Sequence, residues 1–172
     1  MGGHTGAGAV IYFAYGSNMS LLRLRERTPD ARRIATCVLL EHDLRFHKVS
    51  PDGSAKCDTF YTGNREDRVF GAVYEIGKSS ELVLDRVEGL GKGYDKKRVG
   101  VVDLAGNEYE AFTYYATLID PLLLPYGWYR EHVLVGAREL VLPASYLARI
   151  EAVSVMDDPD PEREARQLAV YR

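Results

Sequence analysis

The chain has 172 residues, of which 46% are hydrophobic and 27% are charged, and its formal net charge is -3 at pH 7. This balance is typical of a globular protein and excludes a disordered or fibrous chain, and the length is close to that of one domain. The small negative charge and the lack of long Lys or Arg runs argue against a nucleic acid partner. No apolar run approaches the roughly 18 to 20 residues that span a bilayer, so we do not expect a membrane protein.

The two cysteines, Cys37 and Cys57, have no CxxC spacing and no neighbouring set of histidines. This pattern predicts neither a zinc site nor a disulfide framework. Residues 1–9 are rich in glycine and lack the features of a secretory signal, so we interpret them as a flexible N-terminal tail. We therefore expect a cytoplasmic protein with reduced cysteines and a single domain over residues 10–172.

The first element in chain order is a strand over residues 10–15, which are mostly β-branched or aromatic and end abruptly at Gly16. Residues 19–27 mix apolar and arginine side chains and predict a short helix that stops before Pro29. These segments form a strand, loop and helix unit.

Strands dominate the middle of the chain, where aromatic and β-branched runs are separated by turn residues. We predict strands over residues 36–49, 57–62 and 69–76, and a hairpin of residues 97–104 and 108–116. Strands in succession with helices outside them indicate an α+β fold rather than a regular parallel sheet.

Helices are predicted at four further places. The first runs from a cap at Ser79 or Ser80 through Glu88, and Gly89 is suited to end it in the left-handed conformation. The others follow Pro125 and Pro143 and cover residues 161–170, because proline is tolerated in a first turn.

The segment Tyr15, Gly16, Ser17 and Asn18 is the best candidate for a small-molecule loop. Gly16 lets a ligand approach the backbone, and the successive N–H groups of this loop could point at a carboxylate. The alternative is that Ser17 or Asn18 simply caps the following helix, which is the commoner role of these residue types.

Glu88 is the second candidate site residue, because it ends a predicted helix and follows Asp85 by three positions. The helix dipole and the like charge of Asp85 both favour the protonated form, which suits a group that takes and returns a proton. The alternative is a solvated surface carboxylate, which is common.

Other motifs argue against competing chemistries. The glycine-rich residues 89–94 follow a helix rather than a strand, which is the wrong order for a phosphate-binding loop, so we interpret them as a helix exit that lets Tyr94 line a pocket. The four histidines lack metal-ligand spacing, and no Ser or Cys has the context of a nucleophile elbow. Tyr126 and Tyr129 begin a predicted helix, where a place in the core is the default interpretation.

Three motifs in order resemble the γ-glutamylcyclotransferase-like family: residues 12–19, residues 87–89, and residues 135–138 with Leu142-Pro143 after them. The likeness spans most of the chain. It implies a compact α+β fold with a mixed, barrel-like sheet and peripheral helices, and neither a metal nor an organic cofactor. It also implies conversion of a γ-glutamyl amide or dipeptide to 5-oxoproline with release of an amine or amino acid.

The resemblance also assigns roles to individual residues. Glu88 matches the family's catalytic glutamate, and Tyr15, Gly16, Ser17 and Asn18 match its substrate-binding loop. Tyr129 matches a tyrosine near the bound γ-glutamyl group, and Tyr94 is carried over as a further substrate-binding residue. The glutathione-specific branch has a different residue after Tyr-Gly-Ser, so Asn18 argues against that branch. A homodimer is the expected assembly.

Two other functions remain open at this stage. The same fold and Glu88 could serve a γ-glutamyl amine or a biosynthetic γ-glutamyl protecting group, which the rim of the pocket would decide. A non-catalytic small-molecule-binding protein of the same fold is the alternative from another class.

Overall fold

The computed structural model describes residues 8–172. Five strands close into a barrel in the order β1, β5, β2, β6 and β7, and two further strands form a separate two-stranded sheet, β3–β4. The strands are β1 Ala9–Ala14, β2 Arg32–Leu40, β3 His42–Val49, β4 Ala55–Tyr61, β5 Arg68–Gly77, β6 Tyr94–Asp103 and β7 Glu108–Ala116.

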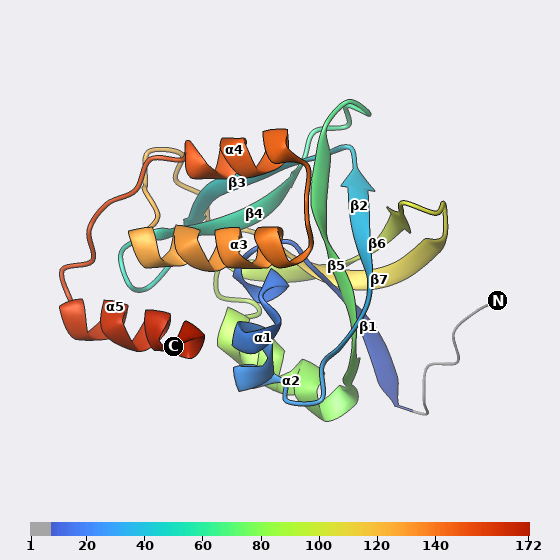
Figure 1. The fold of residues 1–172 in the computed structure, drawn as a ribbon, viewed down its shortest axis with the longest axis horizontal. Coiled ribbons are helices and arrows are strands. Elements are labelled where there is room, and N and C mark those ends of the chain that lie inside the picture. Colours follow the sequence, from blue (N-terminus) through green and yellow to red (C-terminus); the bar gives the residue numbers. More distant parts are fainter. Residues whose placement is uncertain (1–7) are drawn as a thin grey trace.

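The helices lie outside the barrel (Figure 1). They are the 3-10 helix η1 Ser17–Met19, α1 Leu21–Arg27, α2 Lys78–Glu88, α3 Gly127–Glu139, α4 Ala144–Glu151, α5 Pro161–Leu168 and the 3-10 helix η2 Ala169–Tyr171. The predicted α+β class with a barrel-like mixed sheet and peripheral helices is confirmed. None of these described helices is both long and apolar enough to cross a bilayer.

The barrel closes where β1 meets β7 in the parallel direction, with Tyr12 opposite Phe112. Side chains reinforce this closure, because Thr113 Oγ1 donates to the Phe13 carbonyl at 2.8 Å and the Tyr15 hydroxyl donates to the Tyr114 carbonyl at 2.6 Å. On its other side β1 pairs antiparallel with β5. The strand that leads into the candidate loop is therefore fixed on both edges.

Three predictions about elements are wrong. Residues 36–49 are not one strand, because Glu41 takes a φ of 64° and the chain passes there from β2 of the barrel into β3 of the smaller sheet. Neither Ser79 nor Ser80 caps α2, which starts at Lys78 after Gly77, while the Ser80 hydroxyl donates to Asp30. Ala9, which the sequence assigned to the tail of residues 1–9, belongs to β1, and residues 1–7 of that prediction lie outside the described residues.

Helix α3 holds the candidate loop in place. Gly136 faces η1 so closely that a Cβ atom there would lie 2.5 Å from Cβ of Met19, so any larger residue would push the helix away. The Tyr74 hydroxyl of β5 also donates to the Met19 carbonyl at 2.7 Å. Helices α3 and α4 lie side by side (Figure 1), and they contact the smaller sheet through hydrogen bonds of Tyr129 to Cys57 of β4 and of Arg149 to Asp43 of β3. The loop is thus clamped between helix and barrel.

Candidate active site

A narrow inner cavity lies where the end of β1, the end of α2 and the first turn of α3 meet. Every residue that the sequence nominates for the site lines it: Tyr15, Gly16, Ser17, Asn18, Glu88, Tyr94 and Tyr129. Tyr12, Cys57 and Tyr114 complete the lining. The structure therefore brings together segments that are more than 100 positions apart in the sequence.

Glu88 is the last residue of α2, and Gly89 ends the helix in the left-handed conformation with φ 74° and ψ 50°, as predicted. Its Oε1 accepts a hydrogen bond from Nδ2 of Asn18 at 2.9 Å and lies 3.5 Å from Nη1 of Arg27. Arg27 also donates to Oδ1 of Asn18 at 3.0 Å. Asn18 and Arg27 together hold the carboxylate at the cavity.

Asn18 and Ser17 do not cap the following helix, so that alternative is wrong. The cap of α1 is Ser20, whose hydroxyl accepts from the Arg23 N–H, and the Asn18 amide instead donates to Glu88 and to the Tyr12 hydroxyl. Gly16 has φ -109° and ψ -134°, and it also leaves space for its neighbours. A Cβ atom at Gly16 would lie 3.1 Å from Cβ of Cys57 and 3.5 Å from the Tyr129 hydroxyl.

Asp85 is turned toward the barrel. It accepts from the Tyr114 hydroxyl at 2.6 Å and from Nζ of Lys96 at 3.0 Å. The lysine compensates its charge, so the repulsion of Glu88 that the sequence suggested is reduced. Asp85 serves to orient Tyr114, one of the cavity walls.

The tyrosines of the cavity are neutral hydrogen-bonding groups at ordinary pH. Burial raises the pKa of Tyr15, Tyr94 and Tyr129 well above the usual range, and burial followed by the charge of Glu88 raises the pKa of Tyr12. The hydroxyls of Tyr15 and Tyr94 donate to backbone carbonyls, of Tyr114 and Cys57 respectively, and so brace the wall.

Tyr12 and Tyr129 are placed differently. The Tyr129 hydroxyl accepts from the Cys57 N–H at 3.0 Å, and the Tyr12 hydroxyl accepts from Asn18 at 3.2 Å. Because each accepts in these contacts, each keeps its own proton to donate. These two phenols are the candidate side-chain donors to a ligand.

A protein nucleophile has little support within residues 8–172. Cys57 is a free, buried cysteine, and burial raises the pKa of its thiol to about 12, so the reactive thiolate is scarce at neutral pH. No histidine lines the described inner cavity to activate Ser17. Across the same residues, no three His, Cys, Asp or Glu side chains are grouped as a metal site requires.

An outer cavity continues past Glu88 and shares Ser17, Glu88, Tyr94 and Tyr129 with the inner one. Six cationic side chains line it against one carboxylate, that of Glu88: Arg23, Arg27, Lys48, Lys56, Arg86 and Lys92. The outer cavity is therefore strongly positive, which favours an anionic group.

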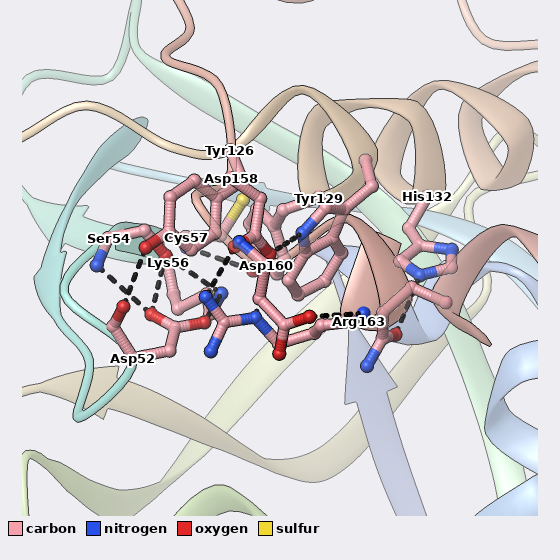
Figure 2. A network of polar contacts seen from close by, with 12 residues as sticks. Asp52, Ser54, Lys56, Cys57, Tyr126, Tyr129, His132, Asp158, Asp160 and Arg163 are labelled. Carbon is pink, nitrogen blue, oxygen red and sulfur yellow. Dashed lines mark hydrogen bonds and ion pairs between the residues drawn. The ribbon is translucent and has the colours of Figure 1, made fainter. Parts of the chain in front are cut away.

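Two of these cations have carboxylate partners close by. Arg27 lies beside Glu88, and Nζ of Lys56 is 2.8 Å from Oδ2 of Asp52. Figure 2 shows Asp52 and Ser54 gathered at the Lys56 ammonium group, beside Tyr126 and Tyr129. Lys56 also lies over the rings of Trp128 and Tyr129, 4.5 and 4.6 Å from their centroids.

The basic lining was not foreseen from the sequence. One signal was available, because Arg23 and Arg27 are four residues apart and so share a face of α1. The remaining cations come from β3, β4, the end of α2 and the turn that follows it, and no local pattern links them. Tyr12 lies within the family-like motif but was not singled out.

The chain is similar to known proteins both in sequence and in structure. Residues 68–150 match the sequence model of the AIG2-like family. Human gamma-glutamylcyclotransferase is 30% identical over 152 residues, an alignment that covers 86% of this chain and 80% of the human protein. The bovine gamma-glutamylcyclotransferase is 29% identical over 154 residues, with 86% and 80% covered.

Solved structures show the same fold. A structure named gamma-glutamyl cyclotransferase superposes with a TM-score of 0.82 at 27% identity, over 94% of this chain and 99% of that one. The crystal structure of an uncharacterized protein from Homo sapiens superposes with a TM-score of 0.83 at 26% identity, over 96% of this chain and 99% of that one.

Proposed function

Because this chain belongs to the gamma-glutamylcyclotransferase family, we propose that it cyclises a γ-glutamyl amide or dipeptide to 5-oxoproline and releases an amine or an amino acid. The observation that supports this most is the placement of Glu88. It is the one carboxylate that lines the described inner cavity, and it is held there by Asn18 among tyrosines that stay neutral.

The reaction needs no protein nucleophile, because the substrate supplies its own. Its α-amino nitrogen attacks its own γ-carbonyl carbon, a new C–N bond closes the five-membered ring, and the original amide C–N bond breaks. The attacking nitrogen loses two protons in total and the departing nitrogen gains two. Glu88 would relay them as general base and then general acid, with no net proton uptake.

Positioning supplies much of the acceleration in such a mechanism. Holding amine and carbonyl at contact distance exploits the large effective molarity of intramolecular reactions. In this proposal the loop from Tyr15 to Asn18 binds the γ-glutamyl group, with its backbone N–H groups facing the α-carboxylate or the developing oxyanion. Tyr94 shapes the wall, and the Tyr129 hydroxyl adds a donor beside Gly16.

The test is incubation with a panel of γ-glutamyl dipeptides, γ-glutamyl amines and glutathione, followed by detection of 5-oxoproline. We expect 5-oxoproline and the released amine in equal amounts, with activity that survives EDTA treatment, because proton transfer needs no metal. Free glutamate in place of 5-oxoproline would indicate hydrolysis and overturn the proposal. Binding without turnover of any member would leave a binding protein.

We also propose a domain organisation, a cellular location and an assembly for this protein. Residues 10–172 would form a single domain that acts in the cytoplasm, as a homodimer without a nucleic acid or membrane partner. Light scattering coupled to size-exclusion chromatography tests the dimer, which predicts twice the mass of one chain.

A further inference from the structure

We propose that Arg23 binds the carboxylate of the amino acid that is released, and that the C-terminal segment of residues 161–171 holds Arg23 in position for this. The inference rests on the proposed function and extends it to the choice of leaving group. It assigns a substrate-selecting role to α5 and η2, which lie beyond the residues matched by the AIG2-like model.

Arg23 is a buried cation with donors to spare. Its residue is 6% exposed, it lines the outer cavity, and within residues 8–172 no carboxylate lies within 4.0 Å of its guanidinium group. Its Nε atom is buried from solvent and has no hydrogen-bond partner among the described residues. A guanidinium at a cavity wall with no carboxylate beside it is suited to an anionic ligand such as a carboxylate.

The orientation of Arg23 is set by α3 and the C-terminal segment. Its Nη1 lies 3.0 Å from Nε2 of His132 and donates to Oε1 of Gln167 at 2.6 Å. Nε2 of His132 also lies 3.1 Å from Oε1 of Gln167, and its Nδ1 lies 2.6 Å from the Tyr171 hydroxyl. These contacts fix Nη1 of Arg23, whereas Nη2 makes no hydrogen bond to the described residues and remains for a ligand.

The leaving group must lie on the side of Arg23. Glu88 is shared by both cavities, and it has to reach the departing nitrogen in order to protonate it. With the γ-glutamyl group in the inner cavity, the group beyond that nitrogen extends past Glu88 into the outer cavity. An amino acid places its carboxylate there, whereas a simple amine offers no charge to the basic lining.

Arg23 is a better candidate than its neighbours in the outer cavity. Arg27 is engaged with Glu88 and Asn18, and Lys56 with Asp52 and Ser54. Lys48 is buried as well, but what holds it is the ring of Tyr94, 4.5 Å away, rather than a set of directed hydrogen bonds. Arg23 combines a free charge with a fixed orientation.

The experiment compares two substrates that differ only in the leaving-group carboxylate, γ-glutamylalanine and γ-glutamylalanine amide. We expect wild-type kcat/KM to be at least about tenfold higher for γ-glutamylalanine than for its amide. One hydrogen bond between charged groups contributes about this much to binding. Arg23→Gln should lower kcat/KM for γ-glutamylalanine by about 10- to 100-fold, mainly by raising KM. The kcat/KM for γ-glutamylalanine amide should change by less than about threefold. Arg25→Gln is the matched control, because Arg25 is an exposed arginine on the same helix outside the cavity.

Gln167→Leu tests the role of the C-terminal segment and also serves if Arg23→Gln does not fold. It removes the acceptor for Nη1 and should reduce the preference for γ-glutamylalanine by about three- to tenfold, with the amide unaffected. Equal loss on both substrates would show that Arg23 is merely structural, and an unchanged preference in Gln167→Leu would remove the segment from the proposal. Equal use of both substrates by the wild type would overturn the inference while the proposed function stands. Failure to form 5-oxoproline from either would overturn both.

Discussion

The side-chain amide of Asn18 donates to the carboxylate of Glu88 across 2.9 Å, so the substrate-loop candidate and the catalytic candidate are in direct contact. This contact joins the end of the first strand unit to the end of α2, 70 positions later. Any change in Asn18 should therefore be felt in the proton transfer as well as in substrate binding.

Asn18→Asp is expected to move the pH dependence of the reaction. It would set a second carboxylate against Glu88, and like charge disfavours the ionised form that has to accept the proton. The acidic limb of the kcat/KM profile should shift to higher pH, with activity at pH 7 reduced by about tenfold or more. Asn64→Asp, the same change in an exposed turn, is the control, and a profile identical to wild type would remove the contact from the mechanism.

Glu88→Gln keeps the size of the side chain but removes its ability to carry a proton. We expect kcat to fall by about 10²- to 10⁴-fold, while a nonreactive γ-glutamyl analogue still raises the melting temperature of the variant. Glu81→Gln changes the same group on the same helix away from the cavity and should retain activity. Turnover by folded Glu88→Gln within a few-fold of wild type would mean that another group moves the protons.

Gly16→Val should impair catalysis through crowding. A Cβ atom at this position would already lie 3.1 Å from Cβ of Cys57, and the two methyl groups of valine would fill space at the Tyr129 hydroxyl. Overpacking of this kind costs typically about 1–3 kcal/mol, and kcat/KM should fall at least tenfold. Gly100→Val on β6, where an added Cβ meets no described atom within 4 Å, should leave steady-state rates intact. Normal activity in Gly16→Val would place the substrate elsewhere.

His132 is expected to make the fold less stable in acid. Burial and then the charge of Arg23 lower the pKa of His132 to about 3, below its value of 6.5 in an exposed state. As pH falls through 6.5, His132 becomes protonated in the unfolded chain but stays neutral in the folded chain. The free energy of unfolding therefore decreases down to about pH 3. Urea titrations between pH 7 and 4 give the free energy of unfolding at each pH. Its decrease per pH unit should be smaller in His132→Gln than in wild type, by up to about 1.4 kcal/mol. Equal slopes would mean that His132 titrates normally.

The sequence predicts the local features of this fold well and the tertiary ones poorly. The left-handed end of α2 at Gly89 is confirmed, because a glycine at the end of a helix is itself a local signal for that conformation. The break between β2 and β3 was missed, because it occurs at Glu41, a residue that seldom takes a positive φ and so gives no turn signal. The predicted cap at Ser79 or Ser80 is wrong, because the Ser80 hydroxyl donates a hydrogen bond to Asp30, which is 50 positions away in the sequence.

Some residues of the candidate site could likewise be found from the sequence, and others only from the structure. Residues 15–18 and Glu88 stand out because a tight loop and a helix end are visible in a short window of sequence. The outer cavity is built by single residues from several elements, and the bond between Arg23 and Gln167 spans 144 positions. Such a grouping exists only once the chain has folded, so the spacing of Arg23 and Arg27 on α1 is the one part of it that the sequence pattern reveals.

The closure of the barrel by β1 against β7 has a consequence for how the protein reaches its native state. The residues paired there, Tyr12 and Phe112, are 100 positions apart, so their contact carries a large cost in loop entropy. The cavity borders this seam, since Tyr12 and Tyr114 belong to both. A partly folded chain with an open seam would therefore lack a complete cavity, and a substrate analogue would selectively stabilise molecules in which the barrel is closed.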